Sequence, residues 1–258
     1  MSAEVLAEFG DYSELINKFQ EDGSLQTYLA ANNQATADWR NTMIDEGFEE
    51  RAKAIPEDAF EVKLPGMFLE SEGNGFSGSM WLYKTITLDF EPEKDSFMYL
   101  GELMDSDKTF VNGVMIGNTE YCYPPRKYPF DGSILKKGEN LIAVRLLVDN
   151  KNGGFLFDHP YYLRSGKNTI SLEGTWLKVY ENEAKSECPK VIMGQTIPTA
   201  LFTASINPIR KMQFTGALWY QGESNGNDPY NKNVGAPEGK GYDLMFVRMI
   251  DLWRKTLN

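Results

Sequence analysis

The chain has 258 residues, enough for one large domain or two of ordinary size, and 41% of them are hydrophobic. Its net charge of -11 and its lack of any long Lys/Arg run exclude nucleic acid as an expected partner. No stretch approaches the ~18 apolar residues of a membrane helix, and the N-terminus lacks the basic and apolar regions of a signal peptide. We therefore expect a globular protein with no membrane span and no export signal in this chain.

The first 56 residues have a helical pattern. "YSELINKFQ" places its apolar residues on one face, and the segment 24–53 contains no proline and begins at Ser24, a suitable helix cap. A pair of helices is the prediction for 1–56.

Residues 57–183 change to the alternating pattern of β-strands. Turn clusters separate the strand-like runs, and no helical pattern comes between them, which predicts a β sandwich or jelly roll. Within "FVNGVMIG", Asn112 and Gly113 tolerate the positive φ angles of a two-residue hairpin turn. The predicted strand runs are 78–90, 96–101, 108–117, 140–148, 168–174 and 175–180.

The two cysteines of the chain, Cys122 and Cys188, lie far apart in the sequence. Neither belongs to a C-x-x-C pair or stands beside a histidine, so the ligands of a zinc site are missing. Two unpaired thiols are expected, and a disulfide between them stays open. No metal ion and no organic cofactor is expected.

The last segment, 184–258, has an α/β pattern. Residues 191–193 are a candidate short strand, and 214–220 are predicted to be a buried strand. The final helix is predicted over 242–257, with its apolar residues on one face: Tyr242, Phe246, Met249, Trp253 and Leu257.

Ser224 lies in "GESNG", a match to the G-x-S-x-G elbow that presents a nucleophilic serine. In that fold the acid and the histidine follow the serine, but the one histidine of this chain, His159, precedes it. A serine without a base to take its proton is an ordinary hydroxyl. We therefore expect a turn here, and keep a hydrolase that pairs Ser224 with His159 as an alternative that chain order disfavours.

Polar residues surround Ser224 at the carboxyl end of the predicted strand. Gln221, Glu223 and Asn225 converge there, and Gly222 allows close approach of the backbone. Amide N–H groups suit the stabilisation of a developing oxyanion. The alternative is a polar turn that caps the following segment.

The block "TALFTASINPIRKMQFTGALWYQGESN" resembles one found in sialate O-acetylesterases, which are carbohydrate esterases of the SGNH (GDSL-like) hydrolase class. "DLMFVRMIDLWR" and "MSAEVLAEF" resemble helices of the same family. The β-rich middle, with "GSMWLYKTITL" and "FVNGVMIG", resembles the galactose-binding-like jelly roll that interrupts the esterase domain. The implied fold is a jelly roll at 57–183 inserted into a partial SGNH α/β domain formed by 1–56 and 184–258.

The resemblance implies deacetylation of an O-acetylated sugar or sialic acid by a serine hydrolase mechanism. Gln221, Gly222, Glu223 and Asn225 would be the oxyanion-binding edge of the active site, and Trp219 and Tyr220 would lie near the substrate. The Gly-Gln-Ser-Asn-Met, Gly-Gly-Thr and Asp-x-x-His blocks of the family do not occur in the 258 residues. We therefore expect a fragment that is inactive alone, from an enzyme that acts outside the cytoplasm. The oligomeric state is not predicted.

A second class of function is a non-catalytic glycan-binding or interaction protein of the jelly-roll type. Aromatic faces stack on sugar rings, and Arg126 could pair with a carboxylate. The other interpretation is that aromatics at alternating strand positions form a core and that the jelly roll has a structural role. The candidates for an exposed binding surface are Trp81, Tyr83, Tyr121, Tyr123, Arg126, Tyr128, Tyr161 and Tyr162.

Overall fold

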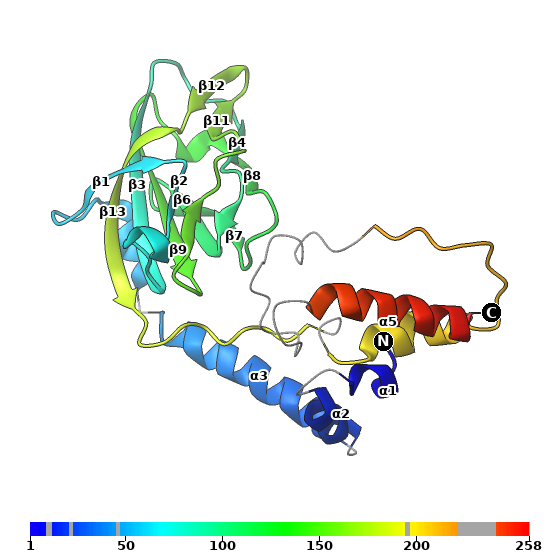
Figure 1. The fold of residues 1–258 in the computed structure, drawn as a ribbon. Helices are drawn as coiled ribbons and strands as arrows, with labels where there is room; N and C mark the ends of the chain where they lie inside the picture. The colour runs from blue at the N-terminus through cyan, green and yellow to red at the C-terminus, as the bar shows by residue number, and fades with distance from the viewer. Residues whose placement is uncertain (9–11, 21–22, 45–46, 194–196, 221–240, 258) are drawn as a thin grey trace. The chain divides into compact units, whose positions relative to one another are not determined.

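The computed structural model describes residues 1–8, 12–20, 23–44, 47–193, 197–220 and 241–257 (Figure 1). The chain divides into two compact units. We call residues 36–189 the β unit, and residues 1–35 together with 190–258 the helical unit. The described residues form mostly antiparallel β-sheets with some helices.

Three antiparallel sheets make up the β unit. The largest has the strand order β1 (Phe60–Leu64), β13 (Gly174–Glu183), β3 (Gly78–Leu88), β9 (Gly138–Val148), β6 (Ser106–Val111) and β7 (Val114–Thr119). A four-stranded sheet has the order β12 (Asn168–Ser171), β11 (Tyr162–Ser165), β4 (Asp95–Tyr99) and β8 (Lys127–Asp131). The smallest consists of β2 (Gly66–Phe68), β10 (Gly153–Phe155) and β5 (Leu103–Met104).

One buried cluster joins all three sheets. Met80 and Leu82 of β3 share it with Met98 of β4, Leu163 of β11 and Phe155 of β10. Because successive strand residues point to opposite faces, this cluster uses one face of each sheet. The β unit is therefore a sandwich with its core between the sheets.

The other face of the six-stranded sheet is also covered. Trp81, Tyr83 and Phe110 pack with Phe48 and Ala52 of the 3-10 helix η1 (Phe48–Lys53). The rings of Trp81 and Phe110 lie 5.6 Å apart. Strand β3 is thus buried on both faces, which explains its nearly continuous hydrophobic sequence.

The predicted strand runs of 57–183 are confirmed, and so is the hairpin between β6 and β7. Asn112 has φ 48° and Gly113 has φ 80°, and Val111 pairs with Val114 across the turn. The sequence analysis missed several short strands, of two to five residues. These are β1, β2, β5, β8, β10 and β11.

The helical unit contains α1 (Ala3–Leu6), α2 (Tyr12–Gln20), the first part of α3 (Ser24–Asn41) and α5 (Gly241–Thr256), which confirms helices within 1–56 and near residue 250. The helical pattern predicted for 24–53 ends as an α-helix at Asn41. Two short turns that were not predicted, the π-helical η5 (Phe202–Ile206) and the 3-10 η6 (Asn207–Ile209), also belong to this unit. Ser24 is the first helical residue, and its hydroxyl donates to the Lys18 carbonyl. The predicted strand at 191–193 is wrong, because these residues have no regular structure.

Candidate functional site

The predicted oxyanion edge, Gln221, Gly222, Glu223 and Asn225, lies outside the described residues, as does Ser224. Its role stays a prediction. The described chain leads up to it through Trp219 and Tyr220 and resumes at Gly241 in α5.

The segment before this edge differs from its prediction. Residues 214–220 were expected to form a buried strand, but they are not a strand and their side chains are exposed, with Tyr220 at 94%. A buried strand needs neighbouring strands to bond its backbone groups. Among the described residues of the helical unit there is no strand to pair with it, so the strand prediction is wrong and the sheet of the expected α/β domain is not observed there.

Trp219 is positioned by side chains of α5. Its ring lies 5.4 Å from that of Phe246 and 5.6 Å from that of Trp253. Together with Met249 and Leu257, these two aromatic residues line one cavity, which confirms the predicted apolar face of the last helix for the side chains that the structure describes.

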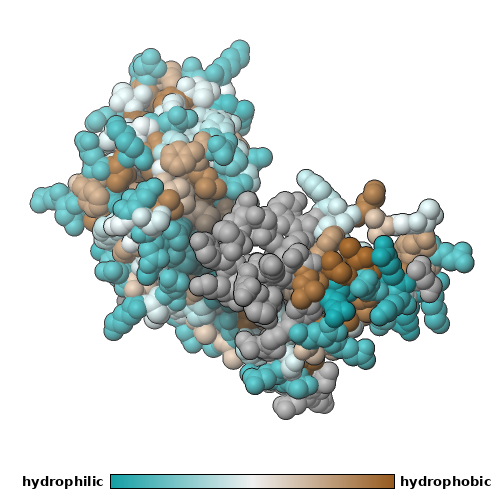
Figure 2. Space-filling model, viewed as in Figure 1, coloured by the Kyte–Doolittle hydropathy of each residue, from teal (hydrophilic) through white to brown (hydrophobic). Residues whose placement is uncertain are grey.

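The cavity beside Trp219 has a volume of about 730 Å³. Its walls are mostly apolar, and hydrophobic residues gather on the surface over α5 (Figure 2). Arg254 is the one charged residue among the described residues that line it. The described lining offers a mostly apolar surface, but it contains no nucleophile with a base.

Arg126 does not lie on a ligand-binding surface, and the expectation that it was exposed is wrong. Its side chain is fully buried, and its Nε donates to Asp107 Oδ1 at 2.7 Å. Nη1 donates to the Cys122 and Pro124 carbonyls, and Nη2 donates to the Asp105 carbonyl. A guanidinium that binds three backbone carbonyls and a carboxylate in this way has a structural role.

Asp107 belongs to the same buried network. Its carboxylate accepts from Arg126, from the Tyr128 hydroxyl at 2.9 Å and from the Thr109 hydroxyl at 2.7 Å. Burial raises the pKa of Asp107 above its ordinary value, while the charge of Arg126 opposes that effect. Buried charges are tolerated when they are paired and hydrogen-bonded, as here.

Most of the aromatic candidates are also core residues. Trp81, Tyr83, Tyr128 and Tyr161 are buried, which confirms the interpretation that these aromatics form a core and removes them as candidates for a binding surface. For Trp81 and Tyr83 the reason is η1, which covers the second face of β3, a packing that no local pattern reveals. The candidates that remain accessible are Tyr121, Tyr123 and the half-buried Tyr162.

His159 lies in the loop between β10 and β11. Its Nε2 is 3.6 Å from Glu102 Oε1. Because Ser224 lies outside the described residues, the alternative that pairs the two is not tested.

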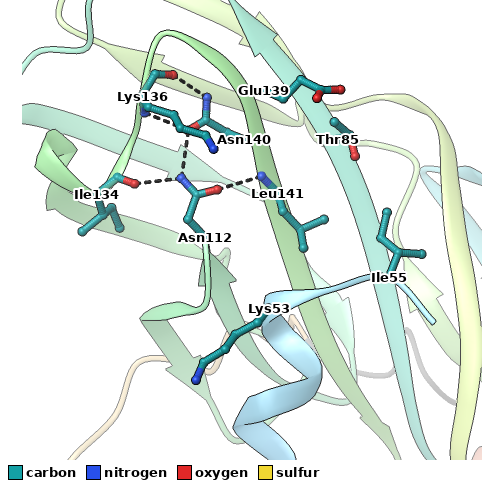
Figure 3. A pocket seen from close by; sticks show the side chains of 9 residues that line it. All are labelled: Lys53, Ile55, Thr85, Asn112, Ile134, Lys136, Glu139, Asn140 and Leu141. Carbon is teal, nitrogen blue, oxygen red and sulfur yellow. Dashed lines mark hydrogen bonds between the residues drawn. The ribbon is translucent and has the colours of Figure 1, made fainter.

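A second cavity, of about 580 Å³, lies in the β unit and was not predicted (Figure 3). The carboxamides of Asn112 and Asn140 form one wall and are bonded to each other at 2.9 Å. Asn112 Nδ2 also donates to the Ile134 carbonyl, and its Oδ1 accepts from the Leu141 N–H. The two side-chain amides are therefore used in hydrogen bonds within the fold. The groups of the lining that could contact a ligand are those of Lys53, Lys136, Glu139 and Thr85.

No group of three or more His, Cys, Asp or Glu side chains within the described ranges is arranged to hold a metal ion. Cys122 and Cys188 are both free thiols. Burial raises the pKa of Cys188 to about 11, which keeps this thiol protonated near neutral pH. None of the helices described is both long and apolar enough to cross a membrane.

Comparison with known proteins gives partial similarity to one kind of enzyme. No protein-family model matches the chain. Over an alignment of 91 residues the chain is 34% identical to a sialate O-acetylesterase of Mus musculus. This alignment covers 32% of this chain and 15% of that protein. A sialate O-acetylesterase of Rattus norvegicus is 34% identical over 67 residues, covering 26% of this chain and 11% of that protein. The chain is thus similar in part to a carbohydrate esterase, and it spans a small part of the length of these relatives.

Solved β-glucuronidases resemble the chain weakly. One from an uncultured Clostridium sp. has 15% identity and a TM-score of 0.35, and covers 53% of this chain and 26% of that one. Another, from Bifidobacterium dentium, has 18% identity and a TM-score of 0.33, and covers 38% of this chain and 17% of that one.

Proposed function

We propose that the chain is part of a carbohydrate esterase that removes acetyl groups from O-acetylated sialic acids or related sugars. The observation that carries this proposal is the 34% identity over 91 residues to the mouse sialate O-acetylesterase. The residues "GALWYQGESN", which resemble an active-site block of that family, support it further.

In this reaction a serine hydroxyl attacks the acetyl carbonyl while a base takes its proton. The carbonyl oxygen becomes an oxyanion, the sugar oxygen leaves with a proton, and water then hydrolyses the acetyl-enzyme. Stabilisation of the oxyanion by preorganised N–H donors is a large part of such catalysis.

The contribution of this chain is the oxyanion edge. Suitable donors are the carboxamide N–H groups of Gln221 and Asn225 and the backbone N–H of Gly222. Glu223 is the fourth residue of the proposed edge. Trp219 lies two residues before Gln221, and its packing against Phe246 and Trp253 supports the start of this segment.

The nucleophile and the histidine come from sequence outside the 258 residues. Ser224 is not the nucleophile in this proposal, because the one histidine of the chain precedes it. The genomic DNA around this reading frame would test the assignment. It would be supported by in-frame codons for Gly-Gln-Ser-Asn-Met and Gly-Gly-Thr upstream of Met1 and for Asp-x-x-His downstream of Asn258. A secretion signal upstream would support an extracytoplasmic enzyme, and stop codons on both sides would contradict both assignments.

A chimera tests the proposed edge directly. The stretch of the mouse enzyme that aligns with this chain is replaced by the sequence of this chain, and acetate release from an O-acetylated sialic acid is measured. The chimera should be active, and Gln221→Ala or Asn225→Ala should lower kcat by about 10²- to 10³-fold, the loss typical of a missing oxyanion donor.

Ser224→Ala in the same chimera is the matched control, and it should keep most of the activity. Circular dichroism and thermal unfolding confirm that each variant is folded. A folded, active chimera that tolerates both amide substitutions would overturn the assignment of the edge.

A further inference from the structure

Three exposed aromatic residues of the β unit lie in two loops at one end of the four-stranded sheet. Among the described residues of this unit they are the most exposed large hydrophobic ones, with Tyr121 at 58%, Tyr123 at 71% and Phe157 at 66%. Tyr121 and Tyr123 belong to the loop before β8, and Phe157 belongs to the loop before β11. Because β8 and β11 both begin beside the end of β4, the two loops leave the sheet at the same end.

Arg126 fixes the first of these loops. Its buried Nη1 donates to the carbonyls of Cys122 and Pro124, at 2.8 and 2.9 Å, and these two residues flank Tyr123. The ring of Pro124 also fixes its own φ angle. The backbone that carries Tyr123 is therefore held in place without a ligand, which lowers the entropy cost of binding one.

The second loop is fixed at the residue before Phe157. Leu156 has both of its backbone groups bonded: its N–H donates to the Glu102 carbonyl at 3.1 Å, and its carbonyl accepts from the Tyr161 hydroxyl at 2.6 Å. Phe157 is thus exposed on a backbone that is held as firmly as that of the first loop.

Gly101 and Glu102 join the two loops. The Gly101 carbonyl accepts from the Arg126 N–H at 2.6 Å, and the next carbonyl, of Glu102, accepts from the Leu156 N–H. The three aromatic residues therefore belong to one surface, which we call the aromatic end. An extended chain rises by about 3.3 Å per residue, so one segment of about eight residues can span both loops.

Acidic residues stand next to these rings. Glu120 precedes Tyr121 and Asp158 follows Phe157, and both acidic residues are exposed. Within the described ranges neither of them forms an ion pair. Glu102, in the segment that joins the loops, is a third acidic residue and is half-buried. The aromatic end is therefore bordered by carboxylates.

The cationic groups nearest in sequence do not cancel this charge. Lys127 Nζ lies over the Tyr99 ring, 6.0 Å from its centroid, and His159 Nε2 is 3.6 Å from Glu102 Oε1. The chain as a whole has a net charge of -11, so its field adds to the attraction of a cation.

We propose that the aromatic end binds a basic segment of a partner protein through arginine side chains of that segment. A guanidinium stacks on aromatic faces and pairs with carboxylates, and it is more weakly hydrated than an ammonium group. Exposed aromatic residues on fixed backbone are the usual anchors of protein interfaces. The bordering carboxylates supply the complementary charge. This inference concerns the β unit and does not rest on the proposed esterase.

Calorimetric titration of the purified 258-residue chain tests the proposal with three octapeptides, each acetylated and amidated at its ends. The first alternates glycine with arginine, the second replaces arginine by lysine, and the third replaces it by citrulline, which is its uncharged isostere. At about 0.15 M salt, where distant charges are screened, the arginine peptide should bind with a Kd on the order of 0.1 mM. The lysine peptide should bind more weakly, by about twofold or more, and the citrulline peptide should not bind.

Leucine substitutions separate the rings from the net charge, which they leave unchanged. Tyr123→Leu and Phe157→Leu should each weaken binding of the arginine peptide by about three- to fivefold, while Tyr123→Phe, which keeps the ring, should retain it. The matched control is Phe60→Leu, which removes an exposed ring from β1 of the six-stranded sheet and should leave binding unchanged. Thermal unfolding checks that all variants are folded.

Four results would overturn the proposal. One is the absence of binding of the arginine peptide at millimolar concentration. Equal binding of the citrulline peptide would mean that the partner is not basic. Binding that is unchanged in both leucine variants would assign the attraction to the net charge of the chain alone. A concentration-dependent dimer that Tyr123→Leu dissociates would make the surface an interface between copies of this chain.

Discussion

The two units of the chain differ in how far their apolar and charged residues are buried. In the β unit a large cluster of apolar residues is buried between the sheets, and the buried Asp107 and Arg126 pair with each other. In the helical unit Leu218 and Tyr220 are almost fully exposed, and a cavity of about 730 Å³ lies beside Trp219. The comparison teaches that the β unit has a buried core of its own, whereas in the segment leading to the proposed active-site edge Trp219 packs on α5 while its neighbours Leu218 and Tyr220 stay exposed.

The largest effect should come from breaking the buried ion pair. Arg126→Met leaves the Asp107 carboxylate without its partner, and should lower the free energy of unfolding of the β unit by about 3 to 5 kcal/mol. Chemical denaturation followed by fluorescence measures this loss. The control is Arg164→Met, which removes an exposed pair with Asp95 and should cost no more than about 1 kcal/mol. Equal losses would show that the burial of Arg126 is wrong.

Truncation of one leucine in each unit sharpens the comparison. Leu82 is fully buried, so Leu82→Ala should cost about 2 to 5 kcal/mol in chemical denaturation. Leu218 is fully exposed, so Leu218→Ala should change stability by no more than about 0.5 kcal/mol. If Leu218→Ala proves as destabilising as Leu82→Ala, the segment 214–220 is packed after all and the comparison fails.

A pair of glycine substitutions tests the backbone in each unit. Gly113 has φ 80° in the hairpin, where an added Cβ would also lie 2.8 Å from Lys53 Cγ. Gly113→Ala should therefore lower the thermal stability by the equivalent of about 1 to 2 kcal/mol. Gly216 has nothing within 4 Å of an added Cβ, so Gly216→Ala should be neutral. A neutral Gly113→Ala would contradict the hairpin conformation.

The last comparison is a pH dependence from Cys188. Burial holds the pKa of its thiol at about 11, above the ordinary 9.0, so the unfolded chain releases this proton first. The stability of the β unit should therefore fall as pH rises from about 9 to about 11. Denaturation curves of the wild type and Cys188→Ala, measured at pH 8 and pH 10.5, should converge at the higher pH. A constant difference between them would refute the raised pKa.

The sequence predicted those parts of the fold that depend on local patterns. The Asn112-Gly113 turn, the long strands and α5 all follow from residues close together in the chain. The burial of Trp81 and Tyr83 depends on η1, which is distant in sequence. The position of Arg126, in the loop before β8, depends on the carboxylate of Asp107 in β6. Alternation alone cannot tell an exposed aromatic row from one that a separate segment covers.

The candidate surfaces illustrate the same limit. Tyr162 was a candidate for glycan contact, but its stacking on Tyr99 depends on the register of β4 and β11. The cavity beside Asn112 and Asn140 depends on contacts between a hairpin and a neighbouring strand. The proposed oxyanion edge, by contrast, was read from a continuous motif and stays a prediction.

The central claim is that these 258 residues hold an oxyanion edge but no nucleophile with its base. Esterase assays of the unmodified chain test this claim most directly. Acetate release from an O-acetylated sialic acid and hydrolysis of p-nitrophenyl acetate are measured for the wild type and for Ser224→Ala. Our account predicts the same negligible rate for both proteins. A wild-type rate well above background that Ser224→Ala abolishes would make Ser224 the nucleophile and contradict it.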